Sequence, residues 1–147
     1  MSKVRFQRAT YVVRDIERAL EFYRDILGFE LEYIMDSELE SYSYPVFEIP
    51  RDRAIRFATL STKEQPRVMA LTEVPGGLED LPMPRRCAVV IEIEDIDGVV
   101  EASRKAGLKV YEEEHLVTQD GREGREVGIV DRDGNLVVIY WITQHPE

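Results

Sequence analysis

The sequence is poor in the residue types from which many reactive sites are built. It contains one cysteine, Cys87, and two histidines, His115 and His145. A single cysteine excludes an internal disulfide, so we expect a reducing, cytoplasmic compartment. No His or Lys lies close to Cys87 in the sequence, and we therefore interpret it as a small buried hydrophobic residue rather than a catalytic thiol. His145 lies in the tail and is expected to be solvated.

Basic residues and long apolar runs are also scarce. The chain has 19 Lys and Arg against 29 Asp and Glu, which gives a formal net charge of -10. Nucleic acids and anionic membranes reward basic patches, so the composition argues against both as partners. No apolar run approaches the length of a membrane span, and the first residues lack a signal-peptide pattern. Hydrophobic residues make up 44% of the 147 residues, which predicts one globular domain over 1–147.

The sequence contains an internal repeat, in which one pattern occurs twice. An apolar strand runs into Asp15-Ile16-Glu17, and another runs into Asp95-Ile96-Asp97. In each case a helix is predicted to follow, because the Asp side chain can accept hydrogen bonds from the free amides of a first helical turn. Gly28 and Gly107 suit the left-handed position that ends such helices. The shift between the repeats is 95 minus 15, or 80 residues.

Each repeat continues with further strands. The Pro- and Gly-rich stretch between the repeats predicts a linker, which gives module one over 4–74, a linker over 75–85 and module two over 86–142. The segments 112–114 and 119–124 have the composition of loops. The predicted strands are 4–13, 29–35, 54–60 and 67–73 in module one, and 86–94, 108–111, 125–131 and 136–142 in module two. The last two form a hairpin about Asp133-Gly134-Asn135.

The predicted modules are thus strand, helix and three strands. The apolar stripe of each helix covers one face of its sheet, and the other face is left for something else. Two such sheets side by side would enclose a concave cleft. The aromatic segment Tyr42–Phe47 allows two interpretations, an edge segment bounded by prolines or a lid over a ligand, and the edge segment is favoured.

The run Phe22-Tyr23-Arg24-Asp25-Ile26-Leu27-Gly28-Phe29, its partner segment over 92–100 and the Asp133-Gly134-Asn135 turn resemble the vicinal oxygen chelate superfamily. This superfamily includes glyoxalase I, extradiol dioxygenases and bleomycin-resistance proteins, and the resemblance covers nearly the whole chain. It implies an α+β fold in which two βαβββ modules form a U-shaped cleft of mixed and antiparallel sheet. It also implies helices on the outer face and a homodimer.

The resemblance implies four positions that hold a divalent metal in the metalloenzymes of the superfamily. In this sequence they fall on Arg8, Ala70, Ala88 and Val138. Arg8 carries a permanent positive charge and the other three carry no donor atom, so none is a normal metal ligand. An error of one residue in this placement would not supply a ligand, because the neighbouring side chain points to the opposite face of the strand. We therefore expect neither a metal nor another cofactor.

The favoured function is binding of an organic small molecule in the cleft, as bleomycin-resistance proteins do. Arg8 suggests a carboxylate, enolate or phosphate on the ligand. Its alternative is an ion pair with Glu92, and the sequence leaves both open. Period-two alternation adds further residues on the cleft side. The expected ligand-binding residues are Arg8, Thr10, Ala70, Thr72, Ala88, Glu92, Val138 and Tyr140.

Three other functions stay open, so whether the chain is an enzyme is left undecided. The first is a metal-dependent glyoxalase-like lyase, isomerase or dioxygenase with displaced ligands such as Glu92, His115 and Glu126. The second is a metal-independent enzyme that uses Arg8, Glu92 or Tyr140 as acid-base groups. The third is a non-catalytic dimer or regulatory module. For His115, a solvated acidic loop is favoured over a metal ligand.

Overall fold

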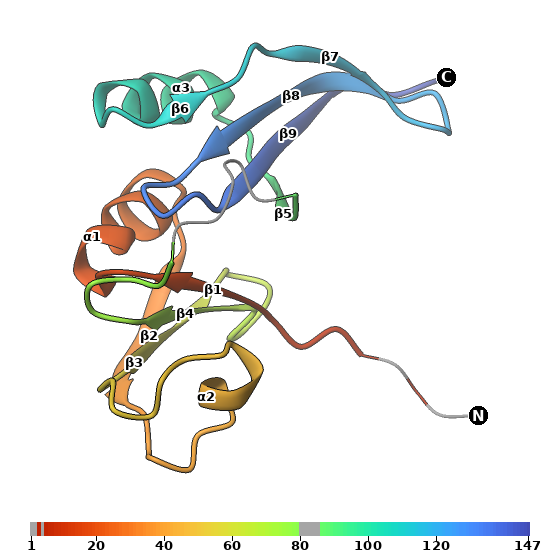
Figure 1. Ribbon diagram of the computed structural model, residues 1–147. Helices are drawn as coiled ribbons and strands as arrows, with labels where there is room; N and C mark the ends of the chain where they lie inside the picture. Colours follow the sequence, from red (N-terminus) through yellow and green to blue (C-terminus); the bar gives the residue numbers. More distant parts are fainter. Residues whose placement is uncertain (1–2, 4, 80–85) are drawn as a thin grey trace. The chain divides into compact units, whose positions relative to one another are not determined.

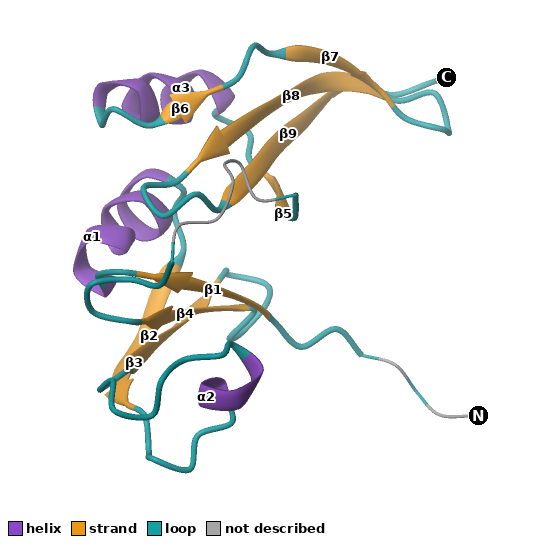
Figure 2. Cartoon of the chain, in the orientation of Figure 1, coloured by secondary structure: helices purple, strands orange, loops and turns teal. Residues whose placement is uncertain are grey.

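The computed structural model describes residues 3, 5–79 and 86–147, and the chain divides into two compact units, residues 1–80 and 81–147. Figure 1 labels their helices and strands, and Figure 2 shows that each unit combines one sheet with helix. Among the described residues, no helix is long and apolar enough to cross a membrane.

The first unit contains a four-stranded sheet with the order β1-β4-β3-β2. β1 and β4 are parallel, and the other neighbours are antiparallel. Its elements in chain order are β1 (Ala9–Val13), α1 (Ile16–Leu20), the π-helix η1 (Glu21–Ile26), β2 (Glu30–Asp36), α2 (Ser43–Val46), β3 (Arg56–Ser61) and β4 (Met69–Glu73).

The second unit repeats this topology with the order β5-β9-β8-β6. β7 also pairs with β8, next to the stretch that pairs with β6, so β6 and β7 act as one interrupted strand. Both units are therefore βαβββ modules, and the predicted α+β class is confirmed. The elements are β5 (Ala88–Glu92), α3 (Ile96–Lys105), β6 (Lys109–Val110), β7 (Glu114–Val117), β8 (Glu123–Val130) and β9 (Leu136–Gln144).

The predicted helix boundaries are confirmed by their caps. Asp15 accepts a hydrogen bond from the Arg18 amide at 2.9 Å, and Asp95 accepts one from the Gly98 amide at 3.0 Å. Gly28 and Gly107 have φ of 95° and 79°, the left-handed conformation that glycine adopts at low cost. The structure adds a π-helical second half to the first helix, with the Leu27 amide bonded to the Phe22 carbonyl at 2.8 Å, which the spacing of apolar residues did not predict.

Each main helix covers one face of its own sheet with apolar side chains. In unit one the fully buried Leu71 and Ala58 share a face with Tyr11, whose ring lies 6.4 Å from that of Tyr23. In unit two, Val137 and Ile139 are fully buried on the equivalent face. We call the opposite faces the far faces. Alternation and register place Thr10, Val12, Tyr33, Met35, Phe57, Thr59, Ala70 and Thr72 on the far face of sheet 1. By the same alternation and register, the far face of sheet 2 carries Ala88, Val90, Glu92, Glu126, Gly128, Leu136, Val138 and Tyr140.

The segment Tyr42–Phe47 is not the expected edge segment, because Ser43–Val46 forms the short helix α2. Tyr44 is buried in a cluster with Ile49, Ile55 and Val74, and its hydroxyl donates to the Arg53 carbonyl at 2.6 Å. Val12, on the far face of sheet 1, packs against this cluster. The aromatic residues thus help to fix α2 to the sheet, while Tyr42 stays exposed.

Two other predictions are wrong. Cys87 is exposed rather than buried, because it precedes β5 instead of lying inside the strand. The loops expected over 112–114 and 119–124 are shorter, since β7 already begins at Glu114 and β8 at Glu123. Acidic residues hid the start of β7 from the sequence analysis, because an edge strand tolerates charges on its solvent side. Val4, at the start of the first expected strand, and residues 80–85 of the expected linker lie outside the described residues.

Candidate functional site

The far face of sheet 1 brings together three of the residues expected from the sequence. Thr10 is the register partner of Ala70 across β1 and β4, and Thr72 follows two residues along the same strand. Ala70 and Thr72 are 5% and 3% exposed, so these side chains are enclosed by protein. On the other side, Ala70 pairs with Thr59 of β3, a buried residue that sequence reasoning missed. Only the pairing of β3 with β4 would have identified it.

Arg8 differs from this group in its secondary structure and in its burial. It precedes β1 in an irregular stretch and is exposed. We expected Arg8 to lie in the first strand, and this expectation about its local structure is wrong. The proposed pairing of Arg8 with Glu92 would join the two units, and it stays a prediction.

The far face of sheet 2 carries the other four expected residues. Alternation places Ala88 and Glu92 of β5 on the same face as Val138 and Tyr140 of β9. Glu92 and Tyr140 are register partners, and the Tyr140 hydroxyl donates to Glu92 Oε2 at 3.3 Å. These residues form a shared surface, as the alternation predicted, and their role in ligand binding stays a prediction.

The environment of Tyr140 decides which chemistry it can perform. Burial raises the pKa of its phenol, and the neighbouring Glu92 carboxylate raises that pKa further by charge and by accepting the hydrogen bond. A general base works best when its pKa lies near the working pH. Tyr140 stays protonated at neutral pH, so it acts as a hydrogen-bond donor rather than as a base.

The displaced metal ligands considered from the sequence are not assembled on one face. Glu126 pairs with Tyr140, so it shares the far face with Glu92. His115 pairs with Arg125 and therefore lies on the opposite side of the strands. Its Nε2 is 2.9 Å from Glu123 Oε1, and its side chain is largely exposed. The structure therefore places His115 on the other face of the sheet from Glu92 and Glu126.

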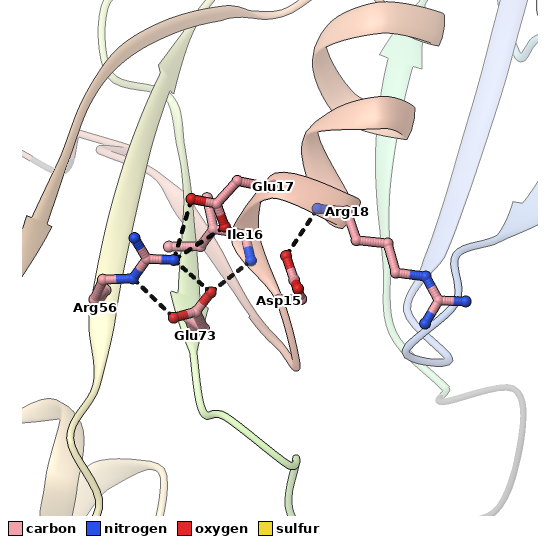
Figure 3. Close-up of polar contacts among 6 residues, drawn as sticks. All are labelled: Asp15, Ile16, Glu17, Arg18, Arg56 and Glu73. Atoms are coloured by element: carbon pink, nitrogen blue, oxygen red, sulfur yellow. Dashed lines mark hydrogen bonds and ion pairs between the residues drawn. The ribbon is translucent and has the colours of Figure 1, made fainter.

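Another group in the described part of the chain has three acidic side chains close enough to share an ion: Asp15, Glu17 and Glu73, whose oxygens lie within 4.8 Å of one another. Figure 3 shows that the Arg56 guanidinium lies against two of them. Arg56 Nε donates to Glu73 Oε1 at 2.8 Å, and its Nη2 donates to Glu73 Oε2 at 2.8 Å and to Glu17 Oε2 at 3.0 Å. The guanidinium therefore supplies the positive charge that a metal would bring.

This group fastens the start of α1 to the sheet. Glu73 Oε2 also accepts from the Ile16 amide at 2.8 Å, while Asp15 caps the same helix. Hydrogen bonding to Arg56 lowers the pKa of Glu73, although burial acts in the opposite direction. The carboxylate is thus held in its charged form by a fixed cation and a helix amide. We interpret this group as structural.

Unit two has a counterpart of the same design. Arg125 Nη2 donates to Asp97 Oδ1 at 2.6 Å and to Glu113 Oε1 at 2.7 Å. Asp97 stands two residues after the capping Asp95, as Glu17 stands two residues after Asp15. Hydrogen bonds to Arg125 lower the pKa of both acidic partners. In each module an arginine of the sheet therefore holds the first turn of the helix.

The four positions at which the resemblance implies metal ligands hold residues that do not fit a divalent ion. Ala70, Ala88 and Val138 lie in strands on far faces but have no donor atom. Arg8 brings a positive charge, which would repel the ion. No step through a metal is derived from these residues.

Comparisons with known proteins agree with this fold. The family model described as Glyoxalase/Bleomycin resistance protein/Dioxygenase superfamily matches residues 5–139. A glyoxalase family protein from Bacillus cereus aligns with a TM-score of 0.74 at 20% identity, over 98% of this chain and 97% of that chain. A glyoxylase/bleomycin resistance protein/dioxygenase domain from Frankia sp. EAN1pec gives 0.68 at 18% identity, over 99% and 96%.

A third similar structure is the fosfomycin resistance protein FosX from Listeria monocytogenes, in complex with Mn(II) and sulfate. It aligns with a TM-score of 0.63 at 17% identity, over 97% of this chain and 92% of that chain. No curated protein matches the chain. At these identities, the structures establish the fold alone.

Proposed function

The chain belongs to the Glyoxalase/Bleomycin resistance protein/Dioxygenase superfamily, and on that premise we propose that it binds an organic small molecule against the far faces of its sheets, without a catalytic metal. One observation carries this proposal: the positions expected for metal ligands hold Ala70, Ala88 and Val138, and all three lie on far faces. These three side chains offer no ligand atom to a divalent ion, but they suit an apolar part of a guest.

The composition of these faces supports an organic guest. Small-molecule sites are mostly apolar, with a few polar groups that fix the orientation of the ligand. On sheet 2, Val138 lies beside Val90, whose side chain is 65% exposed, and the Tyr140–Glu92 pair supplies the polar group. On sheet 1, Ala70 and the neighbouring threonines combine small apolar surface with hydroxyls.

Metal-dependent chemistry receives less support. Mn(II) is present in the FosX structure from Listeria monocytogenes, so a metal is compatible with the fold. In this chain the displaced ligand set would need His115 beside Glu92 and Glu126, and His115 lies on the other face of its strand. We therefore prefer binding without a metal over lyase, isomerase or dioxygenase activity.

A thermal-shift screen against organic compounds tests the proposal. We expect a saturable rise in melting temperature with at least one compound, because a ligand that binds only the folded state stabilises it. Val138→Trp fills the far face of sheet 2 and should abolish the rise. Val117→Trp is the matched control, because Val117 is an exposed strand residue of the same sheet. Equal rises in both variants, or no rise with any compound, would contradict the proposal.

We also propose that the chain forms a homodimer and works in a reducing, cytoplasmic compartment. The dimer is supported by the resemblance of the sequence, and the compartment by the single cysteine. Light scattering during size-exclusion chromatography should give twice the monomer mass of 17.0 kDa. A monomer at micromolar concentration would contradict the dimer.

A further inference from the structure

One hydroxyl group in unit one is buried without a hydrogen-bond partner. Thr59 is 0% exposed, and its Oγ1 has no partner in the described part of the chain. Buried polar groups are nearly always hydrogen-bonded, because an unsatisfied one costs free energy. By contrast, the hydroxyl of Ser61, two residues further along the strand, is hydrogen-bonded. Ser61 Oγ donates to Glu32 Oε1 at 2.8 Å and accepts from the Arg67 amide at 2.7 Å.

Thr59 is part of a group of three threonines around Ala70. Thr59 and Thr10 are the register partners of Ala70 on its two neighbouring strands, and Thr72 follows two residues along β4. Side chains of directly opposed residues lie about 5 Å apart, so Thr10 and Thr59 flank the short side chain of Ala70, and Thr72 is the next residue of β4 on the same face. We call Thr10, Thr59, Ala70 and Thr72 the threonine group.

The threonine group itself carries no charge, and Thr59, Ala70 and Thr72 are buried while Thr10 is half-buried. In the next row of the far face, Val12 packs against the α2 cluster that contains Tyr44. The strand residues assigned to this face carry no charge, and Arg56 and Glu73 lie on the opposite face with α1. The carboxylate near Ser61, that of Glu32, would repel an anion. Moving a charge into such a place is costly, whereas a neutral hydrogen-bonding group enters at little cost.

We propose that the threonine group is a subsite for an uncharged hydrogen-bonding group of the ligand, such as an alcohol, carbonyl or amide, with Thr59 Oγ1 as its buried anchor. This inference rests on the proposed function and narrows the ligand class. A threonine hydroxyl both donates and accepts, so the subsite selects for polarity without charge. Within this subsite, Thr59 determines specificity.

The first test compares two hydroxyl deletions on the same strand in the absence of ligand. Thr59→Val removes a hydroxyl without a partner and should raise the melting temperature. Ser61→Ala removes a hydroxyl with two partners and should lower it. A lower melting temperature for Thr59→Val would mean that the hydroxyl is satisfied within the protein, and that result would overturn the inference.

The second test uses acetamide and acetate, which have the same shape and differ in charge. In NMR spectra of protein labelled at threonine methyl groups, acetamide should shift the Thr59 and Thr10 signals saturably, and acetate should not. Thr59→Ser should retain the effect of acetamide at Thr10, and Thr59→Val should lose it. Equal shifts with acetate, no shift with acetamide, or an unchanged effect in Thr59→Val would overturn the inference.

The outcomes also separate this inference from the proposed function. If organic compounds stabilise the protein but Thr59→Val binds them as the wild type does, the subsite is wrong and the binding function stands. If no compound binds, the binding function itself fails.

Discussion

Arg56 is the residue whose removal most directly tests how unit one is held together. Arg56→Met keeps an unbranched apolar stem and removes the guanidinium that bonds Glu73 and Glu17. Glu73 is 8% exposed, so its carboxylate would be left with the Ile16 amide and no cation. Breaking a fully buried pair costs about 3–5 kcal/mol and an exposed pair about 0–1 kcal/mol. Because Arg56 itself is 34% exposed, we expect a loss of about 2 kcal/mol in the free energy of unfolding.

The second arginine offers a matched control for this substitution. Arg125 is also 34% exposed and also bonds two carboxylates, but its partners Asp97 and Glu113 are 82% and 41% exposed. Arg125→Met should therefore cost less than about 1 kcal/mol. Arg56→Lys should recover part of the loss, because a lysine keeps the charge but not the paired donors.

Urea unfolding followed by circular dichroism measures these differences. The cost is expected to follow the burial of the carboxylate rather than the number of ion pairs. Equal losses for Arg56→Met and Arg125→Met would refute it. A loss for Arg56→Met that persists unchanged as the pH falls through the lowered pKa of Glu73 would refute it as well.

The remaining predictions concern pH, packing and the Tyr140 hydroxyl. The pKa values of Glu73, Asp97 and Glu113 are lowered by their arginines, so their contribution to stability is present above the ordinary carboxyl range and is lost as the pH falls through the lowered values. Hydrogen bonds from Thr118 and Arg122 lower the pKa of Asp120 to about 2. An acid titration of the melting temperature that is flat down to pH 2 would contradict this. Gly124→Ala should lower the free energy of unfolding, measured in urea, by about 3 kcal/mol, because a Cβ there meets the Trp141 carbonyl in the neighbouring strand. Gly107→Ala places its Cβ in open space and should lower the free energy of unfolding by less. Tyr140→Phe should change the free energy of unfolding by less than about 1 kcal/mol, because the bond to Glu92 is long and partly solvated, but it should weaken ligand binding in the thermal-shift screen.

Local signals made much of the fold predictable. Asp15 and Asp95 marked the helix starts, Gly28 and Gly107 marked the ends, and the Asp133-Gly134-Asn135 turn marked the last hairpin. Each of these features depends on a few neighbouring residues, so the sequence displays it directly. The repeat of 80 residues then gave the second module from the first.

What the sequence did not display depends on pairing across long separations. Thr59 reaches Ala70 only because β3 and β4 pair in one register, and Arg56 reaches Glu73 and Glu17 for the same reason. The strand β7 was hidden by its charged residues. The strand predicted from residue 86 begins two residues later, at Ala88, so Cys87 lies outside it. The resemblance identified Ala88 and Val138, and alternation from these positions correctly placed Glu92 and Tyr140 on the same face.

The most direct test of the proposed function is a calorimetric titration of the purified chain with Mn(II) and with Zn(II). We expect no tight binding, because Ala70, Ala88 and Val138 offer no ligand atom. Tight binding of one ion per wild-type chain that is lost in Glu92→Ala would contradict the account.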